Sequence, residues 1–341
     1  MLHSYAQESK MQENKTVTVV VPVFNTGEYI DRCLQSVAAQ TLGDIEVLCI
    51  DDGSTDDSPS RLKAWADKDN RIRIITFPQN KGVPYARNLA IDEAGGKWIY
   101  FLDSDDWIDP DFLEAMVNEA EKTGRDVVIN ASYIYEYDDT SLNHPGADQC
   151  VKQGVDGYYN PALVQSNMFP VVWLRLYRRS YLLSNGVRFP LLRGGIEDNY
   201  FVGLNELLQE RSYIFHGPAY HYYQRRNSLV RTPGNGFRLI QNARLFYDEL
   251  LRRGISTRGV RLVMVLADTD FKDEDEYAFA RKFFLDAEQA IRAEGDLYTL
   301  IVYALMDIVL SCPDLASYRK VCSPNFYVSY IRHNGIGARR R

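Results

Sequence analysis

An uncharged apolar run that passes directly into three carboxylates constrains this chain of 341 residues more than any other feature. Residues 98–102 read Trp-Ile-Tyr-Phe-Leu, and Asp103, Ser104, Asp105 and Asp106 follow them. Such a run, with a helix after it, predicts a buried strand of a parallel sheet. Ligands of these sheets bind at the carboxyl ends of the strands, which is where the four polar residues emerge.

The clustered acids indicate a cation site at this strand end. Carboxylates repel one another unless a cation neutralises them, and Mg2+ or Mn2+ prefers carboxylates together with substrate phosphate. The alternative is a polar loop that caps the next helix. Because Asp109 and Pro110 already supply a helix start, that helix does not need Asp103 or Asp105. The sequence therefore favours the metal site.

Strands alternate with helices along the first 135 residues. Strands are expected at 16–24, 45–50, 71–77, 98–102 and 127–131, and helices at 28–40, 58–68, 82–94 and 112–122. This alternation predicts an α/β fold with a doubly wound, mostly parallel sheet flanked by helices. A helix at 199–209 and a strand at 213–223 are expected next. Amphipathic helices are expected after Gly234, at 237–253, 274–293 and 297–310.

Composition limits the class of protein. The net charge of −7 argues against binding of nucleic acid. Five cysteines without metal-type spacing indicate a reducing compartment. Residues 1–15 lack the apolar core of a signal peptide, and no apolar run reaches the ~18 residues of a membrane span. The sequence predicts a cytoplasmic protein, and the arginines at 339–341 leave a peripheral contact with the inner membrane face open.

Polar residues follow two further strands at the same rim of the sheet. Asp51 and Asp52 follow the second strand, and an acid there can accept from a base N–H or from ribose hydroxyls. Phe24, after the first strand, could lie against the base. Ordinary turn chemistry explains these residues equally well. Arg87, in the helix at 82–94, either reaches a diphosphate or is a surface arginine.

The motifs VTVVVPVFN, DDGSTD, NKG…ARN and YFLDSDD, in this order and spacing, resemble the family 2 glycosyltransferases. These are inverting enzymes of the GT-A fold that use nucleotide-diphospho-sugars. The resemblance is strong over residues 16–135 and continues more weakly to about residue 231 through WLRLYR, GIEDNYF and YHYYQR. It implies transfer of a sugar, with a UDP-sugar expected, to a hydroxyl of a glycan or lipid-linked acceptor. Mn2+ or Mg2+ is the implied cofactor.

The resemblance also implies roles for individual residues. Asp105 is the direct metal ligand, Asp103 lies near the ribose and the metal, and Asp198 is the catalytic base. The nucleotide-binding residues are Pro22, Val23, Phe24, Asp52, Arg87, Asp103 and Ser104. Glu197, Trp173, His221 and Arg225 are expected near the diphosphate or the acceptor.

Bland alternatives stand beside some of these roles. Glu197 and Asp198 also suit a helix N-terminus, and Trp173 also suits a core. A nucleotidyltransferase would need a basic, Gly-rich loop after the first strand, where residues 25–28 carry no basic side chain. A non-catalytic sugar- or nucleotide-binding protein would be expected to lose the acid pair or the base, and the sequence has both.

Three parts are expected along the chain. Residues 1–15 form a polar tail, and residues 235–341 form a C-terminal helical region. Residues 16–234 form the glycosyltransferase domain, with a nucleotide-binding half at about 16–135 and an acceptor half at about 136–234. The helical region could cover the acceptor side, touch the membrane or form a homodimer.

Overall fold

The computed structural model describes residues 15–137, 150–152, 157–159, 171–192, 197–209, 212–225, 235–257, 271–292, 306–307 and 309–321. The chain forms two compact units, each built from segments that alternate along the sequence. The first unit contains Met1–Tyr159, Val171–Phe189 and Ser212–Arg226, and the second contains Asn160–Pro170, Pro190–Arg211 and Asn227–Arg341. The expected domain boundary near residue 234 stays a prediction.

The first unit begins with the predicted alternation of strands and helices. In chain order these are β1 (Lys15–Val23), α1 (Gly27–Ala38), β2 (Ile45–Asp51), α2 (Ser58–Ala66), β3 (Ile72–Thr76), α3 (Val83–Glu93) and β4 (Gly96–Phe101). Then follow β5 (Trp107–Ile108), α4 (Phe112–Thr123), β6 (Val127–Asn130), β7 (Ser132–Tyr137), β8 (Cys150–Lys152) and β9 (Gly157–Tyr159). Later segments add a 3-10 turn (Val172–Leu174), β10 (Arg175–Arg178), α5 (Arg179–Ser184), β11 (Ser212–Phe215) and β12 (Tyr220–Gln224).

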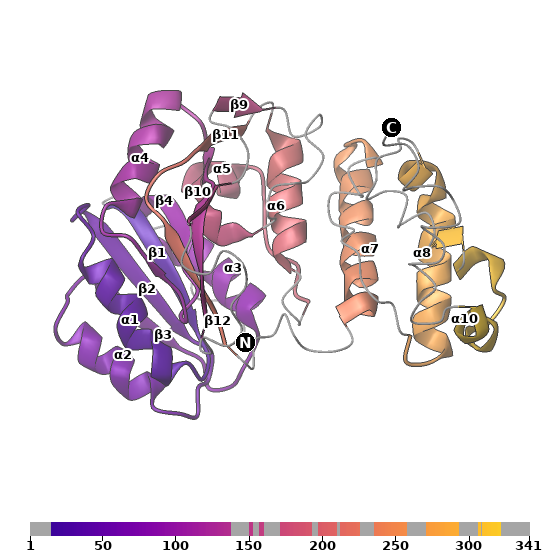
Figure 1. Ribbon diagram of the computed structural model, residues 1–341, viewed down its shortest axis with the longest axis horizontal. Coiled ribbons are helices and arrows are strands. Elements are labelled where there is room, and N and C mark those ends of the chain that lie inside the picture. The colour runs from indigo at the N-terminus through magenta and orange to yellow at the C-terminus, as the bar shows by residue number, and fades with distance from the viewer. Residues whose placement is uncertain are drawn as a thin grey trace, which may run out of the picture. The chain divides into compact units, whose positions relative to one another are not determined.

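Eight strands form the central sheet in the order β3-β2-β1-β4-β10-β6-β11-β9. The pairs β2–β3, β1–β2 and β1–β4 are parallel, and α1 and α2 lie side by side along this part of the sheet (Figure 1). Residues 17–23 of β1 are all buried, which requires that both faces of the strand are covered. The predicted mostly parallel sheet flanked by helices is confirmed.

Two features of the first unit depart from the expected pattern. β10 inserts antiparallel between β4 and β6. The strand expected at 213–223 is wrong in extent, because β11 joins the central sheet and β12 joins a second sheet of order β5-β12-β7-β8. The break between them contains Gly217 and Pro218, and proline cannot donate to a ladder.

The second unit is helical in its described residues. It contains α6 (Glu197–Leu208), α7 (Asn235–Arg253), α8 (Glu274–Arg292) and α10 (Leu315–Val321), and most of the helix expected at 297–310 lies outside the described residues. Aromatic rings fill the interior, where Phe271 contacts Tyr277 and Tyr318 at centroid distances of 5.4 and 5.1 Å. The described part of the chain has no helix that is long and apolar enough to cross a membrane.

Candidate functional site

Three loops meet at one rim of the central sheet because β1, β2 and β4 are parallel neighbours. We call them the β1 loop (residues 24–26), the β2 loop (residues 52–57) and the β4 loop (residues 102–106). The Thr26 hydroxyl donates to the Ser104 hydroxyl at 3.0 Å, and the Asn25 amide donates to the Ser54 hydroxyl at 3.0 Å. These bonds join the β1 loop to both of its neighbours.

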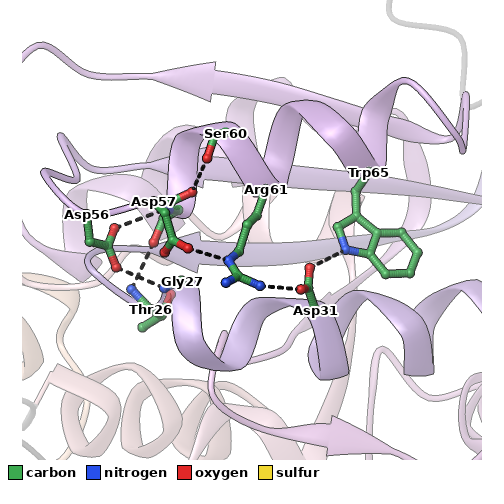
Figure 2. A network of polar contacts seen from close by, with 9 residues as sticks. Thr26, Gly27, Asp31, Asp56, Asp57, Ser60, Arg61 and Trp65 are labelled. Carbon is green, nitrogen blue, oxygen red and sulfur yellow. Dashed lines mark hydrogen bonds and ion pairs between the residues drawn. The ribbon is translucent and has the colours of Figure 1, made fainter.

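A second network holds the starts of α1 and α2 together (Figure 2). Asp56 accepts from the amides of Gly27 and Ser58 at 2.9 and 3.0 Å. Asp31 on α1 accepts from the Trp65 indole of α2 at 2.8 Å. A Cβ at Gly27 would lie 1.7 Å from a side-chain oxygen of Asp57, so a larger residue there would push that carboxylate aside. The β1 and β2 loops are therefore firmly placed relative to each other.

Asp52 holds the turn that starts α3. Its two carboxylate oxygens accept from the amides of Lys81 and Gly82 at 2.7 and 2.8 Å, and Gly82 has a φ of 95° that favours glycine. Asp51 accepts from the Ser54 amide at 2.9 Å, which is ordinary turn chemistry. Each oxygen of Asp52 has a second lone pair, so a contact with a base remains compatible with these bonds. That contact stays a prediction.

Arg87 faces the acids of the β4 loop from the first turns of α3. Its Nη2 lies 2.8 Å from Asp103 Oδ1, and its side chain is only 4% exposed. The guanidinium carbon lies 5.3 Å from the centre of the Phe189 ring. Arg87 is therefore not a surface arginine, and its charge is directed at the predicted cation site.

The acids of the β4 loop differ in their partners. Asp106 is buried and accepts from the Tyr220 hydroxyl and, at 2.7 Å, from the Tyr223 amide, so it fastens β12 to the loop. Burial raises the pKa of Asp106 well above its ordinary value, and the charges of Asp105 and Asp103 raise it further. Asp106 therefore has a structural role.

Asp105 lies beside Arg225, with 2.9 Å between Oδ2 of the acid and Nε of the arginine. Burial raises the pKa of Asp105 to about 6, the charge of Asp103 raises it as well, and the charge of Arg225 opposes both. A metal ion bound next to Asp105 would stabilise its ionised form, because a nearby positive charge lowers the pKa of a carboxyl group.

Asp103 and Asp105 suit a cation that is shared with a substrate. Their side chains are 32% and 17% exposed, so neither is fully enclosed by the protein. Among the described residues, no group of three or more His, Cys, Asp or Glu is arranged to hold a metal alone. Mg2+ and Mn2+ are commonly held by one or two carboxylates, with substrate phosphates and water completing the shell. The two acids fit that mode.

Other predicted site residues lie in less open surroundings. Pro22 and Val23 are buried in β1, whereas Phe24 is 41% exposed at the rim. Trp173 is buried and stacks on Tyr220 at a centroid distance of 4.2 Å, which weighs against a platform for an acceptor sugar. Its predicted role is untested.

His221, on β12, lies between the carboxylates of Asp109 and Glu136. Its Nε2 is 3.1 Å from Asp109 Oδ1, and its Nδ1 is 2.9 Å from Glu136 Oε1. The ring stacks on Trp107 at 4.9 Å. With both nitrogens engaged, His221 has a better-supported role as a clamp than as a diphosphate ligand.

Glu197 and Asp198 lie in the first turn of α6, in the second unit. Glu197 is buried and Asp198 is partly exposed. The two acids therefore lie at a helix N-terminus, which is the alternative role expected from the sequence. The role of Asp198 as the base rests on the family resemblance and not on a distance to Asp105.

Sequence reasoning missed Arg32. Its guanidinium carbon lies 3.6 Å from the ring centre of Trp107 and 4.3 Å from that of Tyr223. Its Nη2 donates to the backbone oxygen of Asp105 at 3.2 Å. The helical period placed Arg32 on the polar side of α1, but no spacing in the sequence connects it with residues 105 or 223.

Comparisons with known proteins find a matching family and similar sequences. Residues 18–184 match the family described as Glycosyl transferase family 2. The chain is 34% identical over 223 residues to the putative glycosyltransferase EpsH of Bacillus subtilis, and the alignment covers 64% of each protein. Glycosyltransferase GlyG of Streptococcus pneumoniae is 27% identical over 303 residues, which are 81% of this chain and 98% of GlyG.

A solved structure resembles the whole chain. The crystal structure of S. aureus TarS 1-349 in complex with UDP-GlcNAc superposes with a TM-score of 0.71 and 20% identity. The match covers 93% of this chain and 92% of the TarS chain. At this identity the likeness establishes the shared fold.

Proposed function

The chain belongs to glycosyl transferase family 2 and has the GT-A fold of that family's enzymes, and on this premise we propose a specific reaction. It transfers a sugar from a nucleotide-diphospho-sugar to a hydroxyl of a glycan or lipid-linked acceptor. The transfer is a direct displacement that inverts the anomeric centre. Asp198 is the general base.

One observation carries the proposal. Two loops and one helix bring four charged residues to one rim of the sheet: Asp52 from the β2 loop, Arg87 from α3, and Asp103 and Asp105 from the β4 loop. The rim thus offers a carboxylate to a base or ribose, and a buried arginine with two acids beside it. A nucleoside diphosphate has a complementary order of groups, from the base through the ribose to the phosphates.

The residues divide the chemistry between them. A carboxylate such as Asp198 takes the proton of the attacking hydroxyl, which the acceptor must lose as it bonds to the anomeric carbon. Arg87 stabilises the charge that gathers on the leaving diphosphate. Asp103 and Asp105 would hold Mn2+ or Mg2+, which when bound neutralises that same charge. A second carboxylate as nucleophile is not needed in a single displacement.

UDP-sugars are the first donors to test. The TarS structure with the same fold contains UDP-GlcNAc, and this supports UDP as the nucleotide without deciding the sugar. The names of EpsH and GlyG specify no acceptor. A growing glycan or a lipid-linked saccharide is the proposed acceptor class.

Donor hydrolysis tests the proposal directly. The purified chain is incubated with UDP-glucose, UDP-galactose and UDP-GlcNAc in turn, with Mn2+ or with a chelator, and released UDP is measured. We expect metal-dependent release with at least one donor, and a loss of about a thousandfold in acceptor transfer for Asp198→Asn. A non-catalytic binding protein would shift its melting temperature with the same donor but release no UDP.

A matched variant separates the base from the fold. Asp198→Asn and Glu197→Gln change neighbouring acids of one helix turn, so both weaken the helix N-terminus similarly. If Asp198 is the base, its variant alone loses transfer while both keep donor binding. Equal activities in the two variants would remove Asp198 from the mechanism.

A further inference from the structure

Arg225 stands at the end of a strand that is tightly fixed to the β4 loop. The residue follows β12, and β12 is held by the bonds from Tyr220 and Tyr223 to Asp106. The clamp of His221 between Asp109 and Glu136 adds two further contacts on the same strand. The position of the Arg225 backbone beside Asp105 is therefore built into the fold.

The Arg225 side chain is directed at the acid that the proposed mechanism gives to the metal. Nε lies 2.9 Å from Asp105 Oδ2, with the two side chains 25% and 17% exposed. The guanidinium carbon lies 5.7 Å from the centre of the Tyr29 ring. A partly buried ion pair of this length is screened less by solvent and salt than an exposed one.

The other two arginines near the β4 loop bind different atoms. Arg87 pairs with Asp103, and Arg32 donates to the backbone oxygen of Asp105 at 3.2 Å. Neither contact takes a carboxylate oxygen of Asp105. Arg225 therefore occupies the carboxylate that a divalent cation would need. The two positive groups would compete for Asp105 and repel each other.

We propose that Arg225 is an exchangeable counter-ion. It pairs with Asp105 in the donor-free enzyme, and it pairs with the donor diphosphate when Asp105 binds the metal ion. The inference rests on the proposed function, because it assumes that Asp105 is the metal ligand. Metal and diphosphate then bind together. Arg225 would leave Asp105 when that carboxylate holds a divalent cation, and its guanidinium would then pair with the diphosphate through the two-pronged geometry that suits phosphate.

This exchange gives the enzyme a positioning residue with a defined cost. While Arg225 holds Asp105, the metal site is available only in a fraction of molecules, and the apparent metal affinity is reduced by that fraction. The diphosphate removes the reduction, because it offers Arg225 a second partner. Metal without donor is therefore held weakly, and metal with donor is held well.

Titration of Mn2+ alone tests the first half of the exchange. Free Mn2+ is counted by its electron paramagnetic resonance signal in the wild-type protein, Arg225→Met and Arg32→Met, all without nucleotide. The Arg32 variant is the matched control, since it removes one positive charge next to Asp105 without freeing the carboxylate. We expect Arg225→Met to bind Mn2+ about tenfold more tightly than the wild type, and Arg32→Met to change the Kd by less than about threefold.

Titration of UDP at saturating Mn2+ tests the second half. Arg225→Met should bind UDP about tenfold more weakly, because the diphosphate loses a charge-assisted partner. The two effects have opposite signs in one variant, which a residue that only supports the fold would not produce. The proposal is overturned if Arg225→Met binds Mn2+ no more tightly than Arg32→Met.

A measurement on the unaltered chain covers the case in which Arg225→Met does not fold. The Nε–Hε signal of Arg225 is assigned in the ¹⁵N spectrum by its absence from Arg225→Lys, which keeps the charge. Addition of Mg2+ alone should shift this signal, and an unmoved signal at a saturating metal concentration overturns the exchange. Neither metal experiment needs a donor sugar, so a failure of the proposed transfer reaction is seen separately in the hydrolysis assay.

Discussion

Acids lie at the ends of both β2 and β4, but their charges are compensated in different ways. Asp51 and Asp52 accept from backbone amides of Ser54, Lys81 and Gly82. In the β4 loop, Asp103 pairs with the Arg87 side chain and Asp105 with the Arg225 side chain. Amides are fixed by the chain, whereas side-chain cations can move.

This difference separates a finished structure from a site that still accepts a ligand. The β2 loop shapes a cradle, because its carboxylates fix the backbone of the turn before α3. The β4 loop disfavours the charged form of its acids, since burial raises the pKa of Asp105 and of Asp106, and a bound cation would stabilise that charged form. Substitutions in the first loop should therefore affect stability most, and substitutions at Asp105 should affect metal-dependent chemistry most.

The largest contrast is expected between Asp105→Asn and Asp52→Asn. Asp105→Asn should lower kcat by about a thousandfold, because the leaving diphosphate would lack the metal ion that neutralises its charge. Asp52→Asn should act mainly on the KM of the donor. Initial rates over a range of donor and Mn2+ concentrations separate the two. If both variants lose kcat to the same extent, the division between the loops is wrong.

The stability contrast runs in the other direction. Asp52→Ala removes the acceptor of two amides and should lower the free energy of unfolding by about 2 kcal/mol. Asp51→Ala removes the acceptor of one amide, that of Ser54, and is the matched control with an expected loss of about 1 kcal/mol. Urea unfolding followed by circular dichroism measures both. A loss at Asp52 that does not exceed the loss at Asp51 would contradict the cradle.

The same contrast explains how far the sequence could predict the molecule. β1 to β4 and α1 to α4 follow from local periodicity, because each strand is one apolar run and each helix has one apolar face. β10 could not be placed, since its antiparallel insertion between β4 and β6 depends on pairing between residues about 46 to 80 positions apart. β5 is two residues long and has no period to read.

Prediction of the site divides at the same point. The loops after β1, β2 and β4 meet at one rim because these strands are parallel. The sequence could therefore predict that Asp52, Asp103 and Asp105 lie near one another. It could not show that Asp106 is bound by Tyr220, 114 residues later. The contacts of Arg225 and His221 likewise join distant segments, and only the folded backbone defines them.

A smaller effect is expected from pH. The pKa of Asp105 is raised to about 6 by burial, and a cation binds the ionised form. Protons therefore compete with Mn2+ below pH 6, and the affinity should fall about fivefold between pH 6 and pH 5 while it stays nearly level above pH 7. Titration calorimetry at four pH values measures this. Affinity that falls as pH rises from 6 to 8 would have the wrong sign.

The smallest expected effect concerns the hydrogen bond that joins the β1 loop to the β4 loop. Thr26→Val keeps the shape of the side chain but removes the buried bond from its hydroxyl to Ser104. It should lower the free energy of unfolding by about 1 kcal/mol. Thr41→Val is the matched control, because the Thr41 hydroxyl donates to Glu114 at an exposed position. Urea unfolding should show a smaller loss for the control, since water replaces an exposed partner. Equal losses would mean that the β1 and β4 loops are held together by packing, and the two loops would then respond to a ligand independently of this bond.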